Sequence, residues 1–182
     1  KELKVDLSWR EKPLQDRITH ALVKGLDEFI VEDSLLVNNV VVGGLSGVDY
    51  LNGSYFFVVD DARNPRFIES KININENKIT AINFVKTTFI RDSSSTFYTE
   101  NALDLESIFF DKENEEIVFV SEGSIRKNKQ PNVFSTALNG KLKSVYKLPK
   151  RFKDNSNIKH NAVFEGSSNS VDNKGFWVSM EG

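Results

Sequence analysis

Apolar and polar residues alternate over short runs along much of the chain, which is the pattern of half-buried β-strands. Residues 66–74 alternate with a period near two, a turn-rich segment follows at 75–78, and residues 79–84 alternate again. A second pair of runs, 133–138 and 142–148, flanks Asn139-Gly140-Lys141. Two such runs joined by turn residues predict a β-hairpin in each case.

A longer phrase occurs three times, at 44–61, 104–123 and 163–182. Each copy has turn-rich residues between two apolar runs, and the first copy contains Asn-Gly, the strongest short-range hairpin signal. In the last two copies the opening and closing glutamates have the same separation, since 122 − 106 = 16 and 181 − 165 = 16. We therefore predict three further hairpins, each with an acidic pair near its open end.

The hairpin at 66–84 follows the first copy of the repeated phrase, and the hairpin at 133–148 follows the second copy. The repeating unit therefore contains two hairpins and spans about 60 residues. Four short antiparallel strands per unit predict an all-β, β-propeller-like fold built from repeated four-stranded blades. The apolar strands at 118–120 and 176–178 are expected to be covered on both faces by neighbouring blades.

Three units are fewer than the roughly four to eight blades of a closed propeller. We therefore expect residues 1–182 to form a single domain of an incomplete propeller, truncated at its C-terminus, whose exposed sheet edges favour self-association. The first 43 residues hold short apolar stretches, for which we prefer strands over a helix at 14–30.

Composition narrows the possible functions. The 24 basic and 26 acidic residues leave no electrostatic footprint for nucleic acid. Cysteine is absent, which excludes disulfides and thiolate chemistry, and no apolar run is long enough to span a bilayer. Only His20 and His160 could serve a serine nucleophile or a nitrogen-based metal site, so carboxylates are the main candidates for chemistry.

Paired carboxylates repel each other unless a cation or a shared proton lies between them. The acidic pairs at the open ends of the hairpins are therefore the best site candidates in the chain. The alternative is structural, because acidic residues at strand ends often brace turns through hydrogen bonds to the backbone.

Several motifs occur in a fixed order from about residue 40 to the end of the chain: Val42-Gly43-Gly44-Leu45-Ser46-Gly47-Val48-Asp49-Tyr50, Val59-Asp60-Asp61-Ala62-Arg63 with Arg66-Phe67, Leu103-Asp104-Leu105-Glu106-Ser107-Ile108, Val120-Ser121-Glu122-Gly123 and Asn161-Ala162-Val163-Phe164-Glu165-Gly166. Together they resemble the phytase-like family described as having esterase-like activity. The resemblance implies an extracytoplasmic bacterial propeller, secreted, periplasmic or anchored at the cell surface, that hydrolyses a small phosphoester or ester.

With this resemblance, the hypothesis for the site is that acidic side chains gather at one mouth of the propeller and hold calcium, which takes about six to eight oxygen ligands. The expected metal ligands are Asp60, Asp61, Asp104, Glu106, Glu122, Glu165 and Glu181. Glu106, Glu165 and Arg63 are the expected catalytic residues, and Arg63 and Arg66 are expected to bind phosphate. The alternative function is a noncatalytic propeller that binds a ligand or a protein.

Overall fold

The computed structural model describes residues 35–76, 78–98, 103–124, 127–152, 163–172 and 174–180. These residues form an all-β fold in which the described part of the chain has no α-helix and the 3-10 helix η4 spans Lys150–Phe152. The strands are β1 (Leu36–Val37), β2 (Val40–Val41), β3 (Leu45–Leu51), β4 (Ser54–Val59), β5 (Arg66–Asn75), β6 (Lys78–Phe89), β7 (Leu105–Asp111), β8 (Glu116–Ser121), β9 (Asn132–Thr136), β10 (Leu142–Val145), β11 (Gly166–Asn169) and β12 (Phe176–Ser179). Within the described ranges, no helix has the length and apolar character that crossing a membrane requires.

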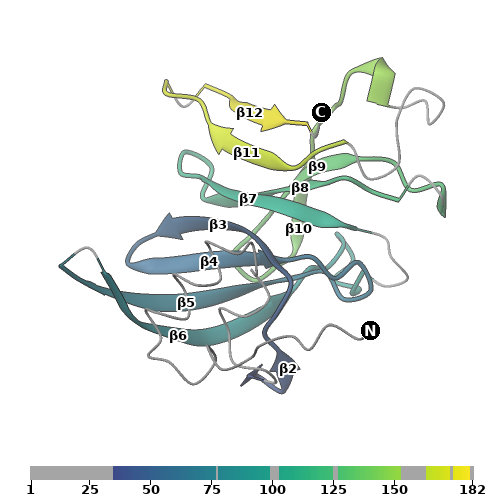
Figure 1. Cartoon of the computed structure of the whole chain (residues 1–182). Helices are drawn as coiled ribbons and strands as arrows, with labels where there is room; N and C mark the ends of the chain where they lie inside the picture. The colour runs from purple at the N-terminus through teal and green to yellow at the C-terminus, as the bar shows by residue number, and fades with distance from the viewer. Residues whose placement is uncertain are drawn as a thin grey trace, which may run out of the picture.

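The strands form three successive antiparallel sheets and a small β1–β2 hairpin. The first sheet has the order β3-β4-β5-β6, the second has β7-β8-β9-β10, and the third consists of β11 and β12. β7 lies between β3 and β11, so the first strands of the three sheets are neighbours (Figure 1). The four-stranded order confirms the predicted unit of two hairpins, and closure into a propeller stays a prediction.

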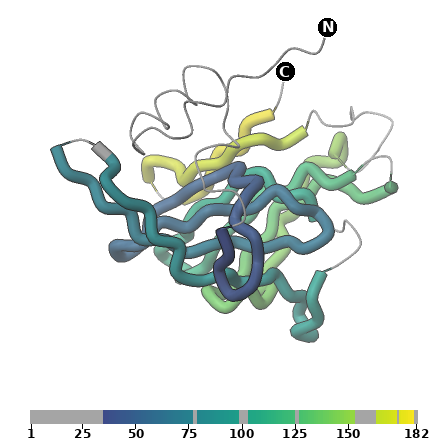
Figure 2. Tube along the Cα trace, turned by 60° about the horizontal axis from the view of Figure 1, so that its bottom comes forward, coloured from purple at the N-terminus to yellow at the C-terminus, as the bar shows by residue number. Residues whose placement is uncertain are grey.

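The hairpins occur where the alternating runs and turn residues predict them. At the β3–β4 turn, Asn52 and Gly53 both have positive φ, 48° and 82°, as the tight turn favoured by Asn-Gly requires. β4 pairs with β5 only between Tyr55↔Ser70 and Val59↔Arg66. Beyond Ser70, β5 therefore pairs only with β6 among the described strands. This part of the two strands forms a ribbon that extends beyond the rest of the sheet (Figure 2).

Aromatic side chains fill the space between the first two sheets. The ring of Phe119 from β8 lies 5.6 Å from that of Phe67 and 5.5 Å from that of Phe134, measured between centroids. Val118, Phe119 and Val120 are all 0% exposed, because alternate side chains enter the cores on the two faces of β8. This confirms the expectation that β8 is covered on both faces.

The third sheet is covered on one face. Phe176 and Val178 pack against the second sheet, whereas the intervening Trp177 is 71% exposed. The expectation of cover on both faces is therefore wrong for β12 within the part of the chain that the structure describes. The expected strands at 1–34 lie outside the described residues.

Candidate metal centre

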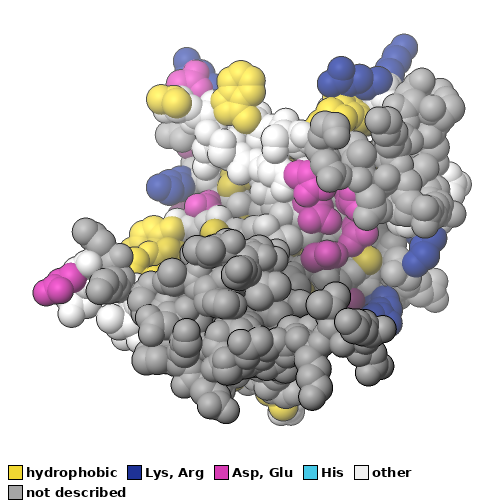
Figure 3. All heavy atoms as spheres, in the orientation of Figure 1, with side chains coloured by type: hydrophobic (Ala, Val, Ile, Leu, Met, Phe, Trp, Pro, Cys, Tyr) yellow, Lys and Arg dark blue, Asp and Glu magenta, His cyan; other side chains and the backbone are white. Residues whose placement is uncertain are grey.

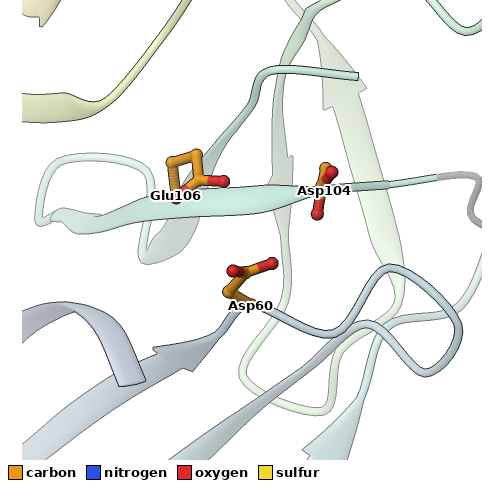
Figure 4. A group of neighbouring side chains, drawn as sticks. All are labelled: Asp60, Asp104 and Glu106. Atoms are coloured by element: carbon orange, nitrogen blue, oxygen red, sulfur yellow. The ribbon is translucent and has the colours of Figure 1, made fainter. Parts of the chain in front are cut away.

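Three carboxylates from two sheets converge near the ends of β4 and β7. One oxygen each from Asp60, Asp104 and Glu106 lies within 4.8 Å of the others. Figure 4 shows Asp60 at the end of β4, facing Asp104 and Glu106 from the β7 segment. Acidic side chains also form one patch on the face seen in Figure 3. The grouping brings Asp60 together with two residues that are more than 40 positions away from it in sequence.

Backbone hydrogen bonds fix the two aspartates. Asp60 directly follows β4, and its N–H donates to the carbonyl of Gly44 at 2.7 Å. The N–H of Asp104 donates to the Oγ of Ser121 at 3.0 Å, and its carbonyl accepts from the N–H of Glu122 at 3.0 Å. Both aspartates are therefore held by the open ends of their own hairpins, although their side chains meet across two sheets.

A β-bulge places Glu106. Leu105 pairs with Ser121 and Ser107 pairs with Val120, so Glu106 is an extra residue in β7 without a Cα partner in the β8 register. Bulges bend a strand and redirect a side chain, and they are frequent beside active sites. The first sheet has a bulge at the corresponding place, where Ser46 lies between Leu45 and Gly47.

Gly47 allows the two bulged strands to approach each other. A Cβ at this glycine would lie 3.1 Å from the carbonyl oxygen of Glu106 and 3.1 Å from the Cα of Ser107. The Oγ of the neighbouring Ser46 donates to the carbonyl of Leu105 at 2.9 Å. The close approach of β3 to β7 therefore depends on a residue without a side chain at position 47.

The electrostatics of the cluster oppose full ionisation. Burial and the carboxylates of Asp60, Glu165, Glu122 and Asp104 raise the pKa of Glu106 to about 8. Burial, together with the hydrogen bond and negative charge of Asp60, raises the pKa of Asp104 to about 6, against the opposing effect of Lys127. Like charges and partial desolvation both disfavour the ionised forms. The negative charges of the cluster are therefore not fully balanced by nearby positive groups.

Comparison with known families agrees with the motifs in the sequence. The family model for phytase-like proteins, described as "Esterase-like activity of phytase", matches residues 40–182. The chain belongs to the phytase-like family. No solved structure matches the chain significantly.

In this phytase-like chain, the other predicted glutamates surround the cluster to different degrees. Glu122 is 5% exposed and follows β8, and Glu165 is exposed at the start of β11. Both contribute negative charge at Glu106. Glu106 and Glu122 are not opposite each other, because Glu106 has no Cα partner in β8 and the N–H of Glu122 donates to the carbonyl of Asp104. Glu181 lies outside the described residues, so its predicted role as a metal ligand stays a prediction.

Asp61 and the two arginines form a separate group. The Nη1 of Arg66 lies 2.7 Å from the Oδ2 of Asp61 and also donates to the carbonyl of Asn64 at 3.0 Å. Burial acts to raise the pKa of Asp61, but hydrogen bonds from Arg66, Asn64 and the Arg63 amide lower it overall. The Arg66 side chain is only 8% exposed, and its Nη donors contact Asp61 and backbone carbonyls, whereas its buried Nε has no partner among the described residues. The expected role of Arg66 in binding phosphate stays a prediction.

Arg63 is oriented differently. Its side chain is 82% exposed, and its Nε lies 3.9 Å from the Oδ1 of Asp61. An exposed contact at this distance adds little to stability, so the guanidinium is open to a ligand. Its expected role in binding phosphate stays a prediction.

Lys127 is a basic residue near the site that the sequence interpretation did not select. It is exposed on the loop that follows Glu122 and Gly123, and its charge reaches the carboxyl of Asp104. The available sequence signal was a lysine five residues after a predicted ligand, just beyond a glycine that can turn the chain. That signal is weak, because lysines in loops are usually solvated.

Proposed function

We propose that this phytase-like protein hydrolyses phosphoesters or carboxylic esters at the cluster of Asp60, Asp104 and Glu106, with calcium as the bound cation. The observation that carries the proposal is the convergence of three carboxylate oxygens within 4.8 Å. The family description, which names an esterase-like activity, supports the reaction class.

The donor set fits a hard cation. The cluster offers carboxylate oxygens, which calcium and magnesium prefer, and nearby backbone carbonyls and water can complete the six to eight ligands that calcium takes. The raised pKa values of Glu106 and Asp104 mean that a positive charge here would relieve both repulsion and desolvation. Glu122 and Glu165 would attract the cation through their negative charge, whereas Asp60, Asp104 and Glu106 would contact it directly.

A bound calcium ion would supply a polarised ester or phosphoryl oxygen and a water molecule of lowered pKa. The protein's own residues have separate tasks. Asp60 is exposed and would bind the cation on the solvent side, whereas Asp104 and Glu106 are half-buried and would hold it from the β7 side. Glu106, which has a pKa of about 8 without metal, would give up its proton when the cation binds and would act as an anionic ligand, because a nearby positive charge favours the carboxylate form. Glu165 and Arg63 are the proposed neighbouring catalytic groups.

Calcium titration of the chelator-treated protein by calorimetry tests the proposal. We expect saturable binding in the unchanged chain, loss of binding in the Asp104→Asn, Glu106→Gln double variant, and unchanged binding in Asp172→Asn, which alters an exposed turn carboxylate. Hydrolysis of 4-nitrophenyl phosphate and 4-nitrophenyl acetate, with calcium or with chelator, tests the reaction. Calcium binding that persists in the double variant, or turnover unaffected by chelator, would overturn the proposal.

A noncatalytic binding role is the second candidate, and a cavity at the other end of the sheets favours it. This cavity has a volume of about 950 Å³ and is lined by hairpin turns from the first two sheets, including Tyr50, Lys112, Glu115 and Leu138. It combines an aromatic ring with charged and apolar groups, as small-molecule sites do. A ligand that binds there should leave calcium titration unchanged.

We propose an extracytoplasmic location, because the resemblance to secreted and surface-attached phytase-like proteins favours it. Calcium sites with the weaker affinities found in extracellular modules would be filled there. Fractionation of cells that express the protein tests the location. Self-association through sheet edges is a related proposal, which light scattering tests.

A further inference from the structure

The hairpins that begin the three sheets have matching registers, so their positions can be compared. Counting starts at the first pair after the bulge in the β3–β4 and β7–β8 hairpins, and at the first pair of β11 and β12. The third pair then contains Phe56 of β4, Val118 of β8 and Trp177 of β12. These three side chains therefore occupy the same place in successive sheets.

In the first two sheets, the side chain at this place packs against the next sheet. Phe56 belongs to the core between the first and second sheets, and its ring centroid lies 4.8 Å from that of Phe110 in β7. Val118 belongs to the core that contains Phe176 and Val178 of the third sheet. The sheets are therefore stacked in order, and each presents this face to its successor (Figure 1).

At the end of the stack, the same face is open. Trp177 is 71% exposed, whereas Val118 is 0% exposed. Large aromatic side chains contribute strongly to packing at interfaces, and both earlier sheets bury the side chain at this place. The order of the stack also indicates what fits against Trp177, namely a face like the one that β7 presents to Phe56.

The first sheet has such a face at the opposite end of the stack. Val48 and Tyr50 of β3 correspond in register to Ile108 and Phe110 of β7. Ile108 and Phe110 are each 2% exposed, because they lie in the core against the first sheet, whereas Val48 is 53% and Tyr50 51% exposed. The β1–β2 hairpin packs on the part of this face around Val59, and it leaves Val48 and Tyr50 accessible to a partner.

We propose that a second copy of this chain covers both faces, so that Trp177 of each copy packs on the partner's Tyr50 and the partner's Val48, as Phe56 packs on Phe110 within the chain. Such a contact joins unlike faces and is heterologous, and it closes into a ring or continues as a filament. Two copies would bring together two sets of three successive sheets, within the roughly four to eight blades of a closed propeller. We therefore expect a closed pair.

The inference is independent of the proposed hydrolysis at the acidic cluster. It gives the proposed self-association a defined surface, on the faces of the first and third sheets rather than on sheet edges. In the closed pair the contact occurs twice, and each occurrence removes a large apolar side chain from water.

Sedimentation equilibrium of the whole chain, from about 1 μM to about 1 mM, tests the inference. We expect a species with twice the 20.7 kDa mass of one chain. Trp177→Asp and Val48→Asp each place an unpaired charge in the apolar contact, and each should raise the Kd of association at least about thirtyfold.

Val145→Asp is the matched control. Val145 is a valine on β10 of the middle sheet, and its 59% exposure is close to that of Val48. This variant should remain within about threefold of the parent in its Kd of association. All three substitutions alter exposed side chains, so each variant should also unfold close to the parent's urea midpoint.

A mixture of the two interface variants tests the direction of the contact. Trp177→Asp retains the face of the first sheet, and Val48→Asp retains the face of the third sheet, so one intact contact can form between unlike variants. We expect the mixture to associate at concentrations where each variant alone is monomeric. A contact between two copies of one face would instead be broken by only one of the two substitutions.

The outcomes separate this inference from the other proposals. A parent that stays monomeric throughout, an equal loss in Val145→Asp, or no recovery in the mixture would overturn it. Association that survives both interface variants would also overturn it, and would favour pairing through sheet edges. Calcium binding and hydrolysis by a monomeric parent would leave the proposed function intact, whereas a pair without calcium binding or hydrolysis would overturn that function alone.

Discussion

The carboxylate of Asp49 accepts a 2.8 Å hydrogen bond from the backbone N–H of Phe110. Asp49 lies in β3 of the first sheet, and Phe110 lies in β7, the edge strand of the second sheet. From the other side, the Nδ2 of Asn169 in β11 donates to the carbonyl of Phe110 at 2.6 Å. Side chains from both neighbouring sheets therefore satisfy the peptide groups of one residue on the edge strand of the second sheet.

Removal of Asp49 should weaken the contact between the first two sheets. Asp49→Ala leaves the N–H of the buried Phe110 without this acceptor, which costs about 1–3 kcal/mol of unfolding free energy. Asp49→Asn retains an acceptor oxygen at the same place and should recover most of the loss. Urea unfolding of the three proteins measures the difference, and equal midpoints for the alanine variant and the parent would contradict the assigned role.

The two arginines near Asp61 should differ in their effect on stability. Arg66→Ala removes the partner of a partly buried carboxylate, and we expect it to lower the free energy of unfolding by about 2 kcal/mol, since Asp61 retains some access to water. Arg63→Ala removes an exposed side chain and should change stability by less than about 0.5 kcal/mol. Thermal or urea unfolding compares them. Similar losses of unfolding free energy in both variants would show that the 2.7 Å ion pair between Arg66 and Asp61 does not cause the loss in Arg66→Ala.

The acidic cluster should make the metal-free protein less stable as pH rises. The folded pKa values of about 6 for Asp104 and about 8 for Glu106 are above those of an unfolded chain, near 4. The folded state therefore holds extra protons, and this stabilisation is complete below about pH 4 and is lost as pH rises through 6 and then 8.

Glu106→Gln provides the measurement. At 1.36 kcal/mol per pKa unit the full effect of Glu106 would approach about 5 kcal/mol, but partial exposure reduces it to the order of 2 kcal/mol. In chelator, the parent should lose melting temperature between about pH 6 and pH 9, and Glu106→Gln should lose less. Parallel pH profiles for the two proteins would argue against a raised pKa at Glu106.

The Phe67–Phe119–Phe134 group should be the strongest single contribution to packing between the first two sheets. Phe119 is 0% exposed, and Phe119→Ala should cost about 3–5 kcal/mol. Phe97 is 56% exposed, so Phe97→Ala should cost less than about 1 kcal/mol. Urea unfolding separates the two. If Phe119→Ala lowered the free energy of unfolding by less than about 1 kcal/mol, the core would have to rearrange and fill the cavity that the substitution leaves.

The repeat and the hairpins were predictable because short-range chemistry determines them. Asn52-Gly53 favours a tight turn with positive φ, and the alternating runs on either side determine which face is buried. The sequence also predicted Asp60, Asp104 and Glu106 as site residues, since acidic residues open or close the repeated hairpins. Which of the seven candidate ligands lie together was not predictable, because this depends on how separate sheets pack.

Two features in particular depend on long-range structure. The bulge at Glu106 has no distinct sequence signal, and it changes which residues face Glu122. The burial of Arg66 depends on its place at the start of β5, behind the turn that contains Asp61. An arginine near two aspartates fits a phosphate-binding role and a structural ion pair equally well in sequence, and only the packing decides that this guanidinium binds Asp61.

The bulges in β3 and β7 put one residue of each strand outside the regular ladder. That residue is Ser46 in one repeat and Glu106 in the next, and the surrounding pairs continue in the same order in both. A substitution at this place can change charge, acidity or metal affinity while the strands keep their partners. These two repeats therefore provide an interchangeable position, through which duplication followed by point mutation could diversify the chemistry at the junction of the sheets without redesign of the scaffold.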